Sequence, residues 1–184
     1  MLEAIEFQNE VKRLLRSGFY GLEEAQKMAG EMIDFPLPEI QASILSQKVY
    51  NETLLEQNQW LGFSDCDRLI QAFEALRSKG VVCCENFSCC GNCGSSEIWD
   101  IIEMAKSMGK TIQGYVFYHQ QDTEKAVEGH GLYFNYGSVN GPSKTIAAQL
   151  VTELQKAGLS PTWNGSPSTR VFVPLEWKRR MWGT

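Results

Sequence analysis

The sequence lacks the features that would place it in a membrane or export it. It contains no apolar run near the ~18 residues that a membrane-spanning helix needs. Its opening stretch, MLEAIEFQNEVKRLL, carries acidic residues early and has no basic segment followed by an apolar one, so it does not read as a signal peptide. We therefore expect a cytoplasmic protein that has no membrane partner.

Several well-known catalytic and binding motifs are also missing. The chain has no G-x-S-x-G, no H-E-x-x-H and no G-x-G-x-x-G, which argues against a conventional serine hydrolase, a zinc protease and a dinucleotide enzyme. Its formal net charge of -5 provides no broad basic surface. The run Lys178-Arg179-Arg180, between Trp177 and Trp182, is short, and we interpret it as a solvated tail. Nucleic acid is therefore not an expected partner.

What is present is the composition of an ordinary globular protein. Of the 184 residues, 43% are hydrophobic and 21% are charged. A chain of this length buries roughly 70% of its unfolded surface, so it needs neither a metal nor a disulfide to be stable. We therefore expect no cofactor. In a reducing compartment the 6 cysteines would be thiols or metal ligands.

The first third of the sequence is predicted to be helical. Apolar residues recur at helical spacing in three stripes, and the prolines of the segment Asp34–Pro38 separate the second stripe from the third. The residues predicted to face inward are Phe7, Val11, Leu14 and Leu15, then Leu22, Ala25, Ala29, Met32 and Ile33, then Ile40, Ile44, Leu45 and Leu54. Residues 1–62 are thus predicted to form a helical subdomain packed on the remainder, 63–184.

Residues 63–184 predict an α+β domain. Ser64 is the expected N-cap of a helix that buries Cys66, and further helices are expected to be capped by Ser95, Asp122 and Ser143. The predicted strands are Val81–Phe87, Thr111–Tyr118, a strand with Leu132, Phe134 and Tyr136 alternating, and a pair formed by Leu159–Trp163 with Val171, Val173 and Leu175. This order resembles a split βαβ, ferredoxin-like arrangement, with a mixed sheet covered by helices on one face.

The densest chemical signal is the cysteine turn between the first predicted strand and its helix. Cys90 and Cys93 form a C-x-x-C, which could act as a redox pair because helix-terminal amides lower a thiol pKa. Cys89, Cys90 and Cys93 could also bind zinc, with His119, His130 or a strand cysteine as fourth ligand. Two features oppose zinc: no second ligand pair is present, and adjacent Cys89 and Cys90 are expected to fit poorly around one ion. A purely structural turn is the simplest interpretation.

A second polar group follows the next predicted strand. His119, Gln120, Gln121 and Asp122 stand at the end of that strand, where histidines, amides and carboxylates often line the mouth of a site. They could bind a small ligand or a protein partner. Alternatively, these residues serve only to cap a short helix.

Several stretches resemble a bacterial family described only as a domain of unknown function. They are SGFY from Ser17, DCDRL from Asp65, GYVFYHQQD from Gly114, GLY from Gly131, and the WNGS and TRV segments from Trp163 and Thr169. The resemblance covers nearly the whole chain and implies a stand-alone bacterial cytoplasmic protein. It implies no activity, cofactor or catalytic residue.

Two functions follow as hypotheses. The first is a non-catalytic binding module that uses His119–Asp122 for a small molecule or a protein. The second is a thiol-redox or zinc-dependent protein centred on Cys89, Cys90 and Cys93.

Overall fold

The structure is a computed structural model that describes residues 2–34 and 37–181. Met1, Phe35, Pro36 and residues 182–184 lie outside the described part, which removes the predicted proline break at Pro36 and the aromatic Trp182 from comparison. The chain divides into two compact units, residues 1–64 together with 178–184, and residues 65–177. The predicted packing of 1–62 on 63–184 stays a prediction.

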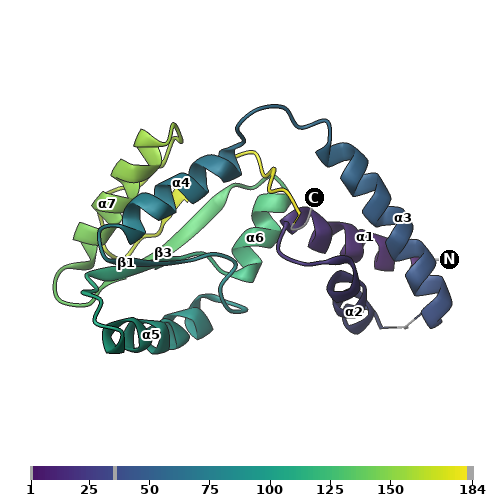
Figure 1. The fold of residues 1–184 in the computed structure, drawn as a ribbon, viewed down its shortest axis with the longest axis horizontal. Coiled ribbons are helices and arrows are strands. Elements are labelled where there is room, and N and C mark those ends of the chain that lie inside the picture. The colour runs from purple at the N-terminus through teal and green to yellow at the C-terminus, as the bar shows by residue number, and fades with distance from the viewer. Residues whose placement is uncertain (1, 35–36, 182–184) are drawn as a thin grey trace. The chain divides into compact units, whose positions relative to one another are not determined.

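The described residues of the first unit form three helices, α1 (Leu2–Ser17), α2 (Leu22–Met32) and α3 (Glu39–Gln57) (Figure 1). α1 packs against both α2 and α3. The predicted stripe of α1 is confirmed, since Phe7, Val11, Leu14 and Leu15 are all buried. Apolar burial along such a stripe is the main stabilising contribution of a surface helix.

The predicted inward faces of α2 and α3 need correction. Met32 is 48% exposed, Ile40 78% and Ile44 65%, so these three side chains do not face the core. α3 instead buries smaller and polar residues, namely Ala42, Ser46, Val49, Thr53 and Gln57. Apolar residues occur on more than one side of α3, so periodicity alone does not select its buried face. Small residues such as Ala42 let neighbouring helices approach closely.

The second unit is built around one four-stranded sheet. Its elements, in chain order, are α4 (Asp65–Arg77), β1 (Val81–Cys84), α5 (Gly91–Ser107), β2 (Gly114–Phe117), α6 (Gln120–Val127), β3 (Leu132–Ser138), α7 (Ser143–Lys156) and β4 (Val171–Val173). The strand order is β1-β2-β3-β4. β1 and β2 are parallel, whereas the β2–β3 and β3–β4 pairs are antiparallel.

The α+β class, with N-terminal helices and a mixed sheet, is confirmed, but two details differ from the predicted arrangement. A split βαβ has another strand between its parallel pair, whereas β1 and β2 are direct neighbours. Helices also cover both faces of the sheet, with α5 opposite α4 and α7 (Figure 1). Gly94 of α5 lies against Phe117, whereas Gly114 lies against Ile146 of α7. Successive strand residues point to opposite faces, so these contacts belong to different layers.

The ends of several elements differ from the predicted ones. α5 begins at Gly91 with Cys90 as N-cap, five residues before the predicted N-cap Ser95. The N-cap of α6 is His119 rather than Asp122. The last predicted strand pair is reduced to a single bridge between Thr162 and Phe172, beside the short β4. Cys66 and the alternating Val171, Val173 and Leu175 are buried, as predicted.

Candidate functional site

The candidate site lies where β1 and β2 end. The carboxyl ends of parallel strands meet at one edge of a sheet, so the segments that follow Cys84 and Phe117 are neighbours. Two backbone hydrogen bonds connect them: Phe87 N–H donates to Tyr118 O at 2.9 Å, and Gln120 N–H donates to Ser88 O at 3.1 Å. The cysteine turn and the His119 segment, which the sequence presents as separate signals, are therefore adjacent.

The three cysteines of the turn come together at the start of α5. Cys90 is the N-cap, Cys93 is in the first turn of the helix, and Cys89 precedes them. Their sulfur atoms all lie within 4.8 Å of one another. The sulfur atoms of adjacent Cys89 and Cys90 thus come close enough together to hold a metal ion, while their expected poor fit around one ion stays a prediction. Cys90 has the extended backbone that is typical of an N-cap residue, with φ of -153°, and Cys93 follows it in the first turn of the helix.

Hydrogen bonds shift the pKa values of Cys90 and Cys93 in opposite directions. The backbone N–H of Cys93 lowers the pKa of Cys90, and the Cys93 thiol adds to the effect. Cys93 keeps its proton more firmly, because its hydrogen bonds to Cys89 and Cys90 raise its pKa to about 11. Cys89 is exposed, and Cys90 and Cys93 are half-buried, so a reagent can reach all three.

The other three cysteines do not belong to this cluster. Burial raises the pKa of Cys83 to about 12 and that of Cys84 to about 11, so both remain thiols at neutral pH. Cys66 is 2% exposed and belongs to the core. Within the described residues, neither histidine nor a strand cysteine joins the three clustered sulfur atoms as a fourth ligand.

His119 and Asp122 form a reciprocal cap on α6. The N–H of Asp122 donates to Nδ1 of His119 at 3.3 Å, and the N–H of His119 donates to Oδ2 of Asp122 at 3.2 Å. Nε2 of His119 lies 3.0 Å from the same carboxylate oxygen. Burial lowers the pKa of His119, which favours the neutral imidazole that this geometry requires, because Nδ1 accepts a hydrogen bond.

Arg170 completes this polar group, and nothing local in the sequence indicates it. Its Nη2 donates to Oδ2 of Asp122 and, at 2.9 Å, to the backbone oxygen of Tyr133. Its guanidinium also lies 5.4 Å from the centre of the Tyr133 ring. The contact joins residues 48 positions apart. Only the pairing of β3 with β4 brings Arg170 to α6.

The predicted ligand-binding residues are thus largely engaged within the protein. The polar atoms of His119 and Asp122 form the cap, and both side chains are buried. Gln120 and Gln121 occupy the first turn of α6. His119 nevertheless borders the cysteine turn, since a methyl group placed on Gly91 would be 3.6 Å from its Nε2. Ligand binding by these four residues stays a prediction.

The basic C-terminal run is used inside the first unit. The guanidinium of Arg179 lies 4.2 Å from the centre of the Phe19 ring, a cation–π contact. Arg180 donates to the backbone oxygen of Trp60 at 3.2 Å. Two of the three basic residues therefore make contacts within the protein, in contrast to the predicted solvated tail.

The chain belongs to the family described as a domain of unknown function, DUF6891, whose model matches residues 3–181. The match confirms the resemblance seen in the sequence. No curated protein and no solved structure matches the chain. Among the described helices, none is both long enough and apolar enough to cross a membrane. The family description names no activity.

Proposed function

We propose that this protein carries out thiol–disulfide exchange through Cys90 and Cys93. The observation that supports the proposal is the grouping of the Cys89, Cys90 and Cys93 sulfur atoms within 4.8 Å of one another at the start of a 17-residue helix. Two thiols at such a separation can form a disulfide after a small adjustment of their side chains. A helix N-terminus also stabilises a thiolate at this position.

The exchange conserves atoms and electrons in two steps. The Cys90 thiolate attacks a sulfur atom of a partner disulfide, and the partner's other sulfur leaves as a thiolate. The Cys93 thiol then gives up its proton and attacks Sγ of Cys90, which releases the second partner sulfur. The protein's dithiol becomes a Cys90–Cys93 disulfide, and the partner disulfide is reduced to two thiols.

The environments of the two cysteines support these roles. The first attack requires a thiolate, and Cys90 is the thiol whose pKa is lowered. A resolving thiol can remain protonated until the mixed disulfide forms, and the pKa of Cys93 is raised to about 11. Once Cys90 is bonded to the partner, it no longer accepts a hydrogen bond as a thiolate from Cys93, so the Cys93 thiol loses part of the interaction that holds its proton.

Binding of a thiophilic metal ion, zinc above all, is the second candidate. The same grouping supports it, because a Zn–S distance of about 2.3 Å in a tetrahedral site places sulfur atoms about 3.8 Å apart. The three thiolates would provide three ligands, and water or another molecule would provide the fourth. The expectation of no cofactor and this alternative are distinguished by elemental analysis of the purified protein.

The test of the redox proposal combines serine variants with mass measurement. Reduced protein is equilibrated with oxidised glutathione, quenched with acid and weighed intact. We expect the wild type and Cys89→Ser to lose two hydrogen atoms without retaining glutathione. The double variant Cys89→Ser/Cys93→Ser should retain one glutathione on Cys90, because no other thiol of the cluster remains to resolve the mixed disulfide.

Three results would count against exchange through this pair. One is a wild type that stays fully reduced in oxidised glutathione. Another is a Cys90→Ser variant that loses two hydrogen atoms as readily as the wild type. The third is stoichiometric zinc, released together with the thiol reactivity by a chelator, which would favour the metal alternative.

A binding module that uses His119, Gln120, Gln121 and Asp122 for a small molecule or protein partner remains a separate hypothesis. Its support is weaker, since the cap on α6 already occupies the polar atoms of His119 and Asp122.

A further inference from the structure

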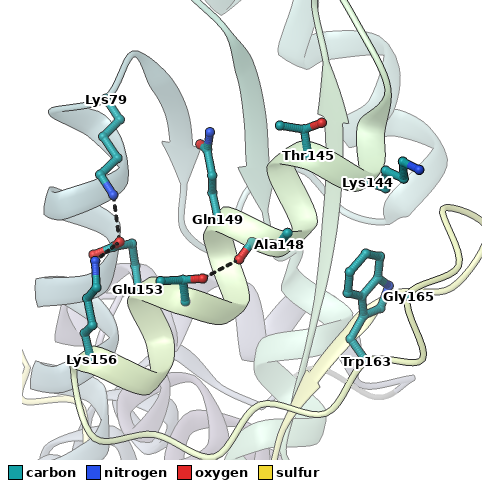
Figure 2. A pocket seen from close by; sticks show the side chains of 10 residues that line it. Lys79, Lys144, Thr145, Ala148, Gln149, Glu153, Lys156, Trp163 and Gly165 are labelled. Atoms are coloured by element: carbon teal, nitrogen blue, oxygen red, sulfur yellow. Dashed lines mark hydrogen bonds and ion pairs between the residues drawn. The ribbon is translucent and has the colours of Figure 1, made fainter.

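A cavity of about 580 Å³ runs along the outer face of α7, and different residues from those of the thiol cluster form it. Its floor is the helix face that carries Thr145, Ala148, Gln149 and Thr152, which are spaced as neighbours on one side of a helix. Figure 2 shows the Trp163 ring beside the turn of α7 that carries Lys144 and Ala148. Small-molecule sites typically have volumes of about 300 to 1,000 Å³.

The cavity is lined by three lysines and only one carboxylate. Glu153, whose side chain is 6% exposed, lies 2.7 Å from Nζ of Lys79 and 2.8 Å from Nζ of Lys156. The Glu153 carboxylate therefore forms ion pairs with two ammonium groups (Figure 2). Lys144, at the other end of the cavity, makes no ion pair with any residue that the structure describes. The lining thus carries a surplus of positive charge in a protein whose net charge is -5.

Two uncharged side chains of the lining, Trp163 and Gln149, could contact an aromatic ligand. The indole of Trp163 is held in place, because its Nε1–H donates to the hydroxyl of Tyr136 at 3.2 Å and to the backbone oxygen of Ser166 at 3.1 Å. Oε1 of Gln149 is buried and has no hydrogen-bond partner among the described residues. A buried acceptor without a donor is costly, so rotation of the Gln149 side chain toward a ligand N–H or O–H in the cavity would be favourable.

We propose that this cavity binds a planar aromatic molecule that carries one anionic group. The ring packs against the Trp163 indole and Ala148, a ring N–H or O–H donates to Gln149, and the anionic group meets the Lys144 ammonium. A fixed indole contributes contact area at little entropic cost. A nucleoside monophosphate and an aromatic carboxylate share this chemistry.

The experiment is isothermal titration calorimetry of the full chain, which measures the affinity for four probes: AMP, indole-3-acetate, adenosine and inorganic phosphate. We expect AMP, indole-3-acetate or both to bind, and adenosine and phosphate to bind more weakly than AMP. Lys144→Gln and Ala148→Glu should each lower the affinity for the bound anion by about tenfold. The first variant removes an attraction to the anionic group, and the second adds a repulsion. Both positions are exposed on α7, so neither change disturbs the core.

Lys27→Gln is the matched control, because it removes an exposed lysine from α2, outside the cavity, and should leave the affinity unchanged. Absence of binding by both ring-bearing anions at about 1 mM would overturn the proposal. So would binding that Lys144→Gln and Ala148→Glu leave unchanged. If inorganic phosphate bound as tightly as AMP and indole-3-acetate did not bind, the ring contact would be refuted.

Discussion

His119 and Asp122 each satisfy the other's backbone N–H at the start of α6, at 3.3 Å and 3.2 Å. The reciprocal arrangement is a capping box in which histidine replaces the usual serine or threonine. Asp122 also accepts from Arg170, so one buried carboxylate connects the start of α6 to the residue before β4. The stability of this end of the sheet should therefore depend on Asp122.

Replacing Asp122 with Ala should lower the free energy of unfolding by about 2 to 3 kcal/mol. The backbone N–H of His119 and the guanidinium of Arg170 would both lose their acceptor. Urea titration followed by circular dichroism measures this change. Gln121→Ala, an exposed position in the same turn, is the control and should remain within about 0.5 kcal/mol of the wild type. Equal midpoints for the two variants would show that the cap is dispensable.

The two glycines that follow Cys90 and Cys93 should respond differently to a methyl group. A Cβ at Gly94 would lie 2.6 Å from Cε2 of the buried Phe117 ring, whereas a Cβ at Gly91 would have its nearest neighbours at 3.6 Å. Gly94→Ala should cost about 1 to 3 kcal/mol through overpacking, in spite of alanine's higher helix propensity. Gly91→Ala should be nearly neutral. Thermal unfolding of the pair measures the difference, and a Gly94→Ala variant as stable as Gly91→Ala would contradict the close packing of α5 on Phe117.

Stability at acid pH should depend on Glu153. Hydrogen bonds from Lys156 and then Lys79 lower the pKa of this carboxyl below 4.5 in the folded protein. Its stabilising contribution is therefore present above pH 4.5 and is lost as the pH falls through the folded pKa. Unfolding free energies measured from pH 7 to pH 3 should decline less steeply at the acid end for Glu153→Gln than for the wild type.

The control for Glu153 is Glu103→Gln, which changes a carboxyl that is 71% exposed on α5. This variant should follow the wild-type curve. A Glu153→Gln curve that is parallel to the wild type over the whole range would mean that the two lysine contacts do not bias the protonation of Glu153.

Val173→Asp should destabilise the protein by at least about 3 kcal/mol. Val173 is fully buried and pairs with Leu132 across β3 and β4, so the substitution places a charge without a partner in the core. Met104→Asp introduces the same residue at an α5 position that is 61% exposed, and should cost much less. Chemical denaturation compares the two. A Val173→Asp midpoint equal to that of Met104→Asp would refute the half-buried strand.

Features that depend on neighbouring residues in the chain were predictable from the sequence. The stripe of α1 and the alternation of Val171, Val173 and Leu175 follow from helical and strand periodicity, which local backbone geometry imposes. The position of the cysteine turn between a strand and a helix was equally readable. The start of the helix was predicted less accurately: Ser95 was the expected N-cap, whereas the N-cap is Cys90 and Cys93 lies within the first turn.

Features that depend on contacts between distant segments were decided only by the tertiary structure. Periodicity could not select the buried face of α3, since apolar residues lie on several of its sides and the choice belongs to the packing against α1. The contact of Arg170 with Asp122 requires β4 to pair with β3. The cavity along α7 requires Trp163 to lie beside Ala148. Sequence periodicity records which residues prefer burial, whereas strand order and helix packing determine which of them meet.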